Sequence, residues 1–236
     1  MKKFIVFFLS FFMLKSFGQN SIDVPKAFEK TIPPKAWSVE WDKLHSSKNE
    51  FKVSIIDKKL EVSKYKESKI CEIKTPDGKF VGINFAEWAG KLLFVPAESE
   101  NKVFTIKDGD IKFIFSYKDK LYFIEGISVM HNSPGALYEI DTSGAAISYK
   151  KILDFDDVPK AFTIYQNQIF VAGYKNFYII NNLKKEVIFE NTFWSSLDPN
   201  SIVAFNYENV FVGIRGGIVK LNLNKKSIKF YSLKQV

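Results

Sequence analysis

The second half of the chain repeats itself at an interval of about 41 residues, and this repeat constrains the fold more than any other feature. A shift of 41 residues places Gln168–Val171 on Asn209–Val212 and Lys184–Lys185 on Lys225–Lys226. An earlier copy starts near Leu121, where the shift is 48 residues before a break and 40 residues after it. The earlier copy therefore carries an insertion of eight residues. Repeats of this length indicate one supersecondary unit that packs against copies of itself.

Each copy has the pattern of four short β-strands. In the last copy we expect them at about 202–206, 210–214, 218–222 and 228–232. Short runs of Val, Ile, Phe and Tyr between turns of Gly, Asn, Asp and Lys are typical of an all-β chain. A four-stranded unit of this length has the size of a propeller blade. The sequence predicts an all-β fold, a β-propeller of about five four-stranded blades, with a β-sandwich or barrel as the alternative.

The first half of the chain is less regular. Leu92–Val95 aligns with Leu121–Ile124, which predicts a blade within residues 80–106 that is truncated or takes its outer strand from elsewhere in the chain. Strands at 51–56, 60–65 and 70–74 would form one more blade, followed by a turn at Thr75–Gly78. We divide the chain into a signal peptide at 1–18, an extended leader at 19–40 and one propeller-like domain at 41–236.

The segments Gln168–Phe189 and Asn209–Phe230 resemble the blades of quinoprotein-like and sensor-type β-propellers. They share an apolar strand, a glycine turn, an apolar strand ending in Asn, and a Lys-rich turn. The resemblance covers residues 111–236 and implies the architecture alone. The tryptophan docking motif of quinoprotein blades is absent, as are WD and YWTD signatures, so the resemblance implies no quinone cofactor.

The N-terminus has the layout of a secretory signal peptide. Lys2 and Lys3 precede an apolar run from Phe4 to Leu14, and the small residues Ser16 and Gly18 follow. An eleven-residue apolar run is about 16 Å long as a helix, too short to span a bilayer. We expect export to the periplasm or the extracellular space, with cleavage after Gly18.

The charge of the chain does not indicate nucleic-acid binding. Cleavage after Gly18 removes three lysines and lowers the formal net charge from +8 to +5. Arg215 is the only arginine, whereas recognition of phosphates and bases favours arginine. We expect an exported monomer with no membrane span and no nucleic-acid partner.

Few residues carry recognisable chemistry. Cys71 is the only cysteine and lies in an apolar, strand-like run, which favours a buried apolar role. The acidic clusters Asp108–Asp110 and Asp154–Asp157 lack the full ligand set of a calcium loop. His45 lies in a polar stretch and is expected on the surface. The sequence predicts no metal site, no cofactor and no catalytic residue.

One face of the predicted propeller concentrates polar and aromatic residues. In this topology, the turn between the second and third strands of each blade shares a face with the connections between blades. The insertion at 127–135 and the connections at 154–160 and 193–201 belong to that face. The candidate partner-binding residues are His131, Asn132, Asp156, Asp157, Trp194, Asp198 and Arg215.

Two functions fit this face. The first is a non-enzymatic binding protein that grips a protein or glycan partner. The second is a carbohydrate-active enzyme of the cell envelope, a lyase or glycosidase, that uses His131 with Asp156 or Asp157. We favour binding, because the sequence contains no recognised catalytic constellation.

Overall fold

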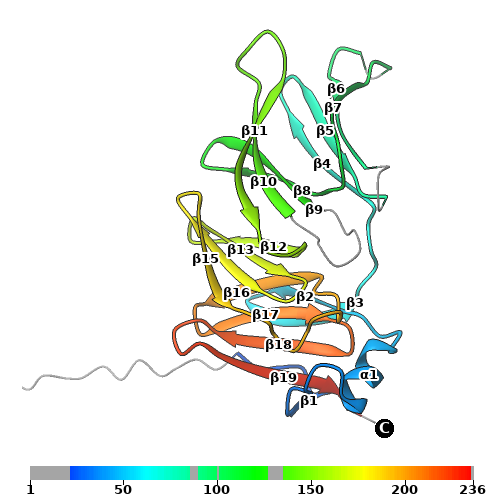
Figure 1. The fold of residues 1–236 in the computed structure, drawn as a ribbon, viewed down its shortest axis with the longest axis vertical. Coiled ribbons are helices and arrows are strands. Elements are labelled where there is room, and N and C mark those ends of the chain that lie inside the picture. Colours follow the sequence, from blue (N-terminus) through cyan, green and yellow to red (C-terminus); the bar gives the residue numbers. More distant parts are fainter. Residues whose placement is uncertain (1–21, 86–89, 100, 127–134, 235–236) are drawn as a thin grey trace, which may run out of the picture.

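The computed structural model describes residues 22–85, 90–99, 101–126 and 135–234, and these residues form antiparallel sheets with one short helix (Figure 1). The chain is therefore all-β, as the repeat predicts. In the described residues, four sheets have at least four strands each, and a fifth sheet is a separate two-stranded hairpin.

The hairpin consists of β2 (Phe51–Ile56) and β3 (Lys59–Lys64). The first large sheet consists of β4 (Ile70–Thr75), β5 (Gly78–Ile83), β6 (Lys91–Pro96) and β7 (Phe104–Asp108). The second consists of β8 (Ile111–Tyr117), β9 (Lys120–Gly126), β10 (Gly135–Asp141) and β11 (Ser148–Phe155). The third consists of β12 (Pro159–Tyr165), β13 (Gln168–Gly173), β14 (Phe177–Asn181) and β15 (Lys184–Phe189). The fourth consists of β16 (Ser201–Asn206), β17 (Asn209–Ile214), β18 (Gly217–Asn222) and β19 (Ser227–Leu233), with β1 (Phe28–Thr31) as a fifth strand.

Tight two-residue turns join many neighbouring strands. The pairs Asp57-Lys58, Lys118-Asp119, Gln166-Asn167 and Asn182-Leu183 all have positive φ angles, between 47° and 62°. Turns of this kind match the twist of antiparallel strands, and Asn and Asp tolerate the left-handed conformation well. The Asn, Asp and Lys residues that divide the apolar runs of the sequence therefore close the hairpins.

The strands of the last repeat lie within one residue of their predicted positions. The turn at Thr75–Gly78 is also confirmed, because these two residues pair where β4 meets β5. The insertion of the earlier copy, at 127–135, lies almost entirely outside the described residues.

Two assignments in the first half are wrong. The segment 70–74 does not join the strands at 51–56 and 60–65; it forms β4 and pairs with β5. The sheet within 80–106 is also not truncated, since β4 to β7 make four complete strands. Leu92–Val95 forms the third strand of its sheet, whereas Leu121–Ile124 lies in a second strand. Second and third strands are both interior and apolar, so their short runs cannot be told apart by composition.

Apolar layers join each sheet to the next. Strand β13 shows how: Ile169 and Val171 pack against the β8–β11 sheet, while Phe170 and Ala172 pack in the layer shared with the β16–β19 sheet. Successive side chains of a strand point to opposite faces, so a strand covered on both sides is apolar throughout. Strand β17 is likewise buried along its whole length.

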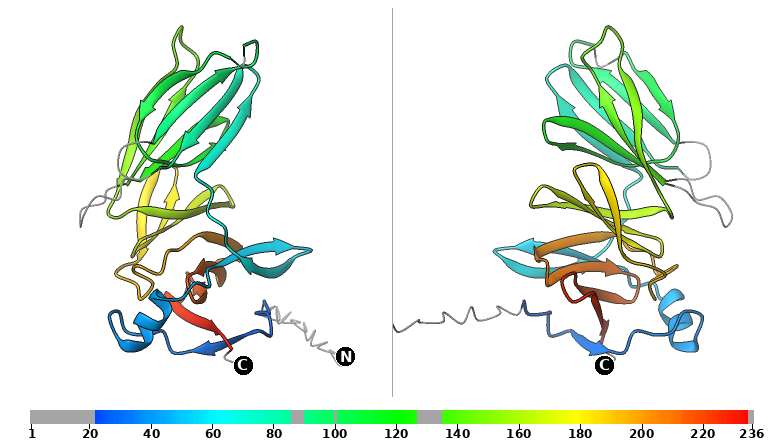
Figure 2. Two further views of the ribbon diagram at one scale, coloured as in Figure 1. Left: turned by 90° about the vertical axis from the view of Figure 1, so that its right-hand side faces the viewer. Right: turned by 60° about the vertical axis from the view of Figure 1, so that its left-hand side comes forward.

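Figures 1 and 2 show the sheets following one another along the long axis of the molecule. The β4–β7 sheet lies at one end, and the β16–β19 sheet lies towards the other. The β2–β3 hairpin packs on the β16–β19 sheet through Phe51, Val53 and Leu60. The four-stranded sheets fit propeller blades, but no closed ring is shown.

The N-terminal segment belongs to the last sheet. Strand β1 pairs antiparallel with β19, from Phe28 opposite Leu233 to Thr31 opposite Phe230. Helix α1 (Val39–His45) follows, with the Ser38 hydroxyl accepting a hydrogen bond from the Trp41 amide at its start. Trp41 is buried in the layer between the third and fourth sheets.

Because the sheets share their apolar layers, we expect the domain to fold as one unit. Deleting residues 200–236 would expose one face of β13 and β14, including Phe170 and Phe177, and should abolish soluble folding. The solubility and thermal melt of the truncated protein, compared with the chain that starts at Gln19, test this expectation. A cooperative melt of the truncated protein would contradict it.

Candidate functional site

The turns between second and third strands lie beside the connections between sheets. The Tyr174 amide, after β13, donates to the Val158 carbonyl in the connection before β12, at 2.9 Å. The Arg215 amide, after β17, donates to the Leu197 carbonyl in the connection before β16, at 2.7 Å. One face of the molecule therefore carries both kinds of loop.

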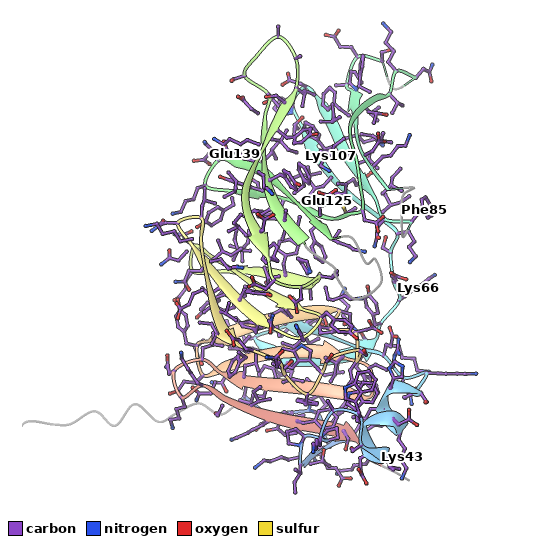
Figure 3. All side chains as sticks on the ribbon, viewed as in Figure 1. Lys43, Lys66, Phe85, Lys107, Glu125 and Glu139 are labelled. Carbon is purple, nitrogen blue, oxygen red and sulfur yellow. The ribbon has the colours of Figure 1, made fainter. Side chains whose placement is uncertain are left out.

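This face holds a cleft of about 270 Å³, which we call the central cleft. The five segments at or before the starts of β2, β4, β8, β12 and β16 all reach it; β8 and β12 contribute strand residues, and the others contribute the residues that precede them. Lys66, labelled in Figure 3, lies in the linker between β3 and β4, the segment that supplies Tyr65, Glu67 and Ser68 to the cleft. The lining residues are Glu50, Tyr65, Glu67, Ser68, Asn84, Lys112, Phe113, Pro159, Lys160, Asp198, Pro199, Asn200 and Arg215.

Two larger hollows lie elsewhere. One, of about 650 Å³, lies between α1, β1 and the end of β19. The other, of about 840 Å³, lies among the turns of the first two large sheets. Neither contains a residue of the predicted binding set, and each is lined by one or two neighbouring sheets. The central cleft is lined by segments next to all five sheets.

Arg215 organises one wall of the cleft. Its Nη2 lies 2.9 Å from Glu50 Oε1 and 2.6 Å from Asp198 Oδ2, and its Nε also donates to Glu50. Its Nη1 donates to the His45 carbonyl at 3.0 Å. Lys160 Nζ approaches the other oxygen of Asp198 at 3.2 Å. Charge-assisted hydrogen bonds of this kind are strong and directional, so Arg215 fixes the positions of three distant segments.

Two lysines enter the cleft from equivalent positions in neighbouring sheets. The register of β8 against β9 shifts between Ile111 and Phe113, and that of β12 against β13 shifts between Pro159 and Ala161. Lys112 and Lys160 are the residues skipped at these two irregularities. A β-bulge redirects the side chain of the extra residue, and here both ammonium groups reach the same cleft.

Lys112 has an unusual environment. Its Nζ donates to Asn84 Oδ1 at 2.7 Å and lies 4.0 Å from Asp110 Oδ2. Burial lowers the pKa of Lys112, the Asp110 carboxylate opposes this effect, and the positive charge of Lys160 adds to the lowering. The ammonium group of Lys112 therefore lacks the close carboxylate partner that Lys160 has.

Unsatisfied polar groups lie in and beneath the cleft. The side chain of Asp110 is 3% exposed, and neither of its carboxylate oxygens accepts a hydrogen bond. The Nδ2 of Asn200, in the cleft wall, is buried and has no acceptor. A buried polar group without a partner costs about 1–3 kcal/mol. Such groups mark a place where the fold keeps an unfavourable arrangement.

The predicted binding residues fall into four groups. Asp198 and Arg215 line the cleft and contact each other. Asp156 lies outside the cleft, where it forms an exposed ion pair with Lys185 at 2.7 Å. His131 and Asn132 lie outside the described residues.

Asp157 and Trp194 are buried and do not form part of a contact surface. Burial raises the pKa of Asp157, while hydrogen bonds from the Tyr178 hydroxyl and the amides of Lys175 and Asn176 oppose this rise. Trp194 is fully buried in the layer between the third and fourth sheets, and its Nε1 donates to the Gly173 carbonyl. The expectation that Trp194 offers an exposed aromatic contact is therefore wrong, because the indole packs between sheets.

Several cleft residues were not predicted from the sequence. Glu50, Tyr65 and Asn84 come from the irregular first half, where no repeat marks their position. Lys112 and Lys160 did carry a signal: they are 48 residues apart, the shift that relates the earlier copy to the next. His45 is close to the cleft without lining it; its ring stacks on Trp41, and its Nδ1 lies 3.1 Å from the Ser196 carbonyl oxygen.

Comparisons with known proteins identify no family. No family model matches the chain, and no curated protein matches it. Among solved structures, a structural genomics protein of unknown function from Bacteroides thetaiotaomicron aligns over 72% of this chain and 52% of its own, at 11% identity and a TM-score of 0.42. The chain thus aligns with about half the length of that protein.

Two further findings concern the described part of the chain. No helix there is long and apolar enough to cross a membrane. No group of three or more His, Cys, Asp or Glu side chains there is placed to hold a metal ion. Cys71 contacts the apolar layer between the first two large sheets, and burial raises the pKa of its thiol to about 11.

The burial of Trp194 gives a direct test of its role. Trp194→Ala should lower the free energy of unfolding by about 3–5 kcal/mol, since it leaves a large cavity between two sheets. The matched control is Trp37→Ala, because Trp37 is 76% exposed, and its loss should cost less than about 1 kcal/mol. Urea denaturation of both variants measures the difference. Equal stabilities would contradict the assignment of Trp194 to the core.

Proposed function

We propose that this chain is an exported, non-enzymatic binding protein, and that it grips a protein or glycan partner with the face that carries the central cleft. The observation that carries the proposal is that the segments at or before the first strands of all five sheets converge on one polar cleft. Binding sites are typically concave, with a few fixed polar groups that orient the ligand. Asp198 and Arg215, predicted from the sequence, lie at its wall.

The same convergence supports a propeller of about five blades. The starts of β2, β4, β8, β12 and β16 surround the cleft in the way that the first strands of blades surround a propeller axis. In this proposal the β2–β3 hairpin is a fifth blade reduced to two strands. Its outer face carries Lys52, Lys59 and Glu61, a polar surface typical of a terminal repeat.

The alternative, a lyase or glycosidase, finds less support. It was based on His131 with Asp156 or Asp157, and neither aspartate lines the cleft. Of the three carboxylates that do, Glu50 and Asp198 accept hydrogen bonds from Arg215, and Glu67 forms an ion pair with Lys69 at 2.8 Å. Each of these carboxylates thus has a cationic partner within the protein. An enzyme of this kind needs a carboxyl group free to exchange a proton with its substrate.

Export is part of the proposal and rests on the sequence of residues 1–18. We expect the mature protein to begin at Gln19 and to appear in the periplasm or the medium as a monomer that does not bind nucleic acid. Mass spectrometry of its N-terminus, together with cell fractionation, tests this expectation. An intact Met1 on a membrane-bound protein would contradict it.

A charge reversal at the rim of the cleft tests the binding face. Glu67 lines the cleft and its side chain is 52% exposed, so Glu67→Lys should leave the fold intact. Capture of partners from an envelope extract by the tagged mature protein should fall at least tenfold. The control is Glu61→Lys, which makes the same change on the exposed outer face of the hairpin. If both variants capture the same partners as the unaltered protein, the cleft is not the binding face.

A further inference from the structure

The wall of the central cleft holds hydrogen-bond donors that the described residues leave without an acceptor. Glu50 Oε1 and Asp198 Oδ2 already receive hydrogen bonds from Arg215, and Asp198 Oδ1 receives one from Lys160. The Lys112 ammonium group carries three N–H donors, yet Asn84 Oδ1 is its one acceptor among the described residues. The side-chain amide of Asn200 has no acceptor in this part of the chain. A ligand that supplies acceptor oxygens would satisfy these donors.

The position of Lys112 indicates that the ligand carries a negatively charged acceptor group. Its side chain is 17% exposed, and Lys160 lines the same cleft. Asp110, at 4.0 Å, is beyond hydrogen-bond distance and lies beneath the cleft wall. Two ammonium groups in a part-buried site repel each other, and the charge of Lys160 contributes to the lowered pKa of Lys112. An oxyanion between them would replace repulsion with two favourable contacts.

Other residues of the wall suit hydroxyl groups. Tyr65 and Glu67 come from the linker between β3 and β4. Burial, together with the charges of Glu67, Glu50 and Asp198, raises the pKa of Tyr65, so its phenol keeps its proton and can donate it. Glu67 is half exposed and can accept from a ligand. The volume of about 270 Å³ is below the range of about 300–1,000 Å³ that holds drug-sized molecules.

We propose that the central cleft binds a sugar acid, a single sugar unit with a carboxylate, as the end or a branch of an acidic glycan. The carboxylate contacts Lys112 and Lys160, while the ring hydroxyls contact Tyr65, Glu67 and the amide of Asn200. This assignment rests on the proposed binding function and names the chemical class of its partner.

Calorimetric titration of the mature protein with glucuronate and galacturonate tests the assignment. At least one of these sugar acids should bind at least tenfold more tightly than glucose, which lacks the carboxylate, and than acetate or phosphate, which lack the ring. Lys112→Gln should weaken this binding at least tenfold, because it removes the ammonium charge. Lys112→Arg should restore part of it. The control is Lys229→Gln, an equivalent change on the exposed side of β19.

The outcomes separate this inference from the function on which it rests. Absence of binding by both sugar acids, or equal binding of glucose, acetate or phosphate, would overturn the sugar-acid assignment. If partner capture still depends on Glu67 in that case, the proposed binding function stands without it. If a sugar acid binds as expected but no partner is captured, the assignment of the cleft stands and the proposed gripping of a larger partner fails.

Discussion

Burial of both faces of the interior strands is the constraint on which the rest of the structure depends. Strands β13 and β17 are apolar at nearly every position, because neighbouring sheets cover them on both sides. Phe170 and Trp194 fill one such layer, and Tyr178 and Phe155 fill another. Each sheet is therefore incomplete without its neighbours, as in other repeat architectures. This stacking brings the starts of the first strands together and so creates the central cleft.

The polar network of Arg215 connects segments between strands that the apolar layers do not hold together. Glu50 precedes the hairpin, Asp198 precedes the last sheet, and Arg215 closes the turn between β17 and β18. The partial burial of these groups makes their contacts stronger than those of surface ion pairs, which contribute little. In this network Arg215 and Lys160 donate to Glu50 Oε1 and to both oxygens of Asp198. Lys112 and Asn200 are left as donors, and the ligand chemistry we infer follows from that imbalance.

The positions of the strands can be predicted from the sequence where the repeat is regular. In the last copy, the predicted strands lie within one residue of β16 to β19. In the first half, an apolar run such as Leu92–Val95 fits a second or a third strand equally well. The sequence comparison aligned it with a second strand, whereas it forms a third strand, β6. The first strands of the large sheets in fact start at Ile70, Ile111, Pro159 and Ser201, so the repeat extends through the whole domain. Divergence of the polar turns, rather than of the strands, conceals it in the first half.

The sequence by itself determined the all-β class, the four-stranded repeat and the side of the molecule on which Asp198 and Arg215 lie. These features follow from local patterns, because strand alternation, turn residues and repeat length act over a few residues. The tertiary structure alone decided that Trp194 and Asp157 are buried and that Lys112 and Lys160 share a cleft with Glu50. Burial and charge pairing depend on segments more than a hundred residues apart, as Glu50 and Arg215 are. Local sequence patterns do not predict which side chains that are distant in the sequence will be in contact.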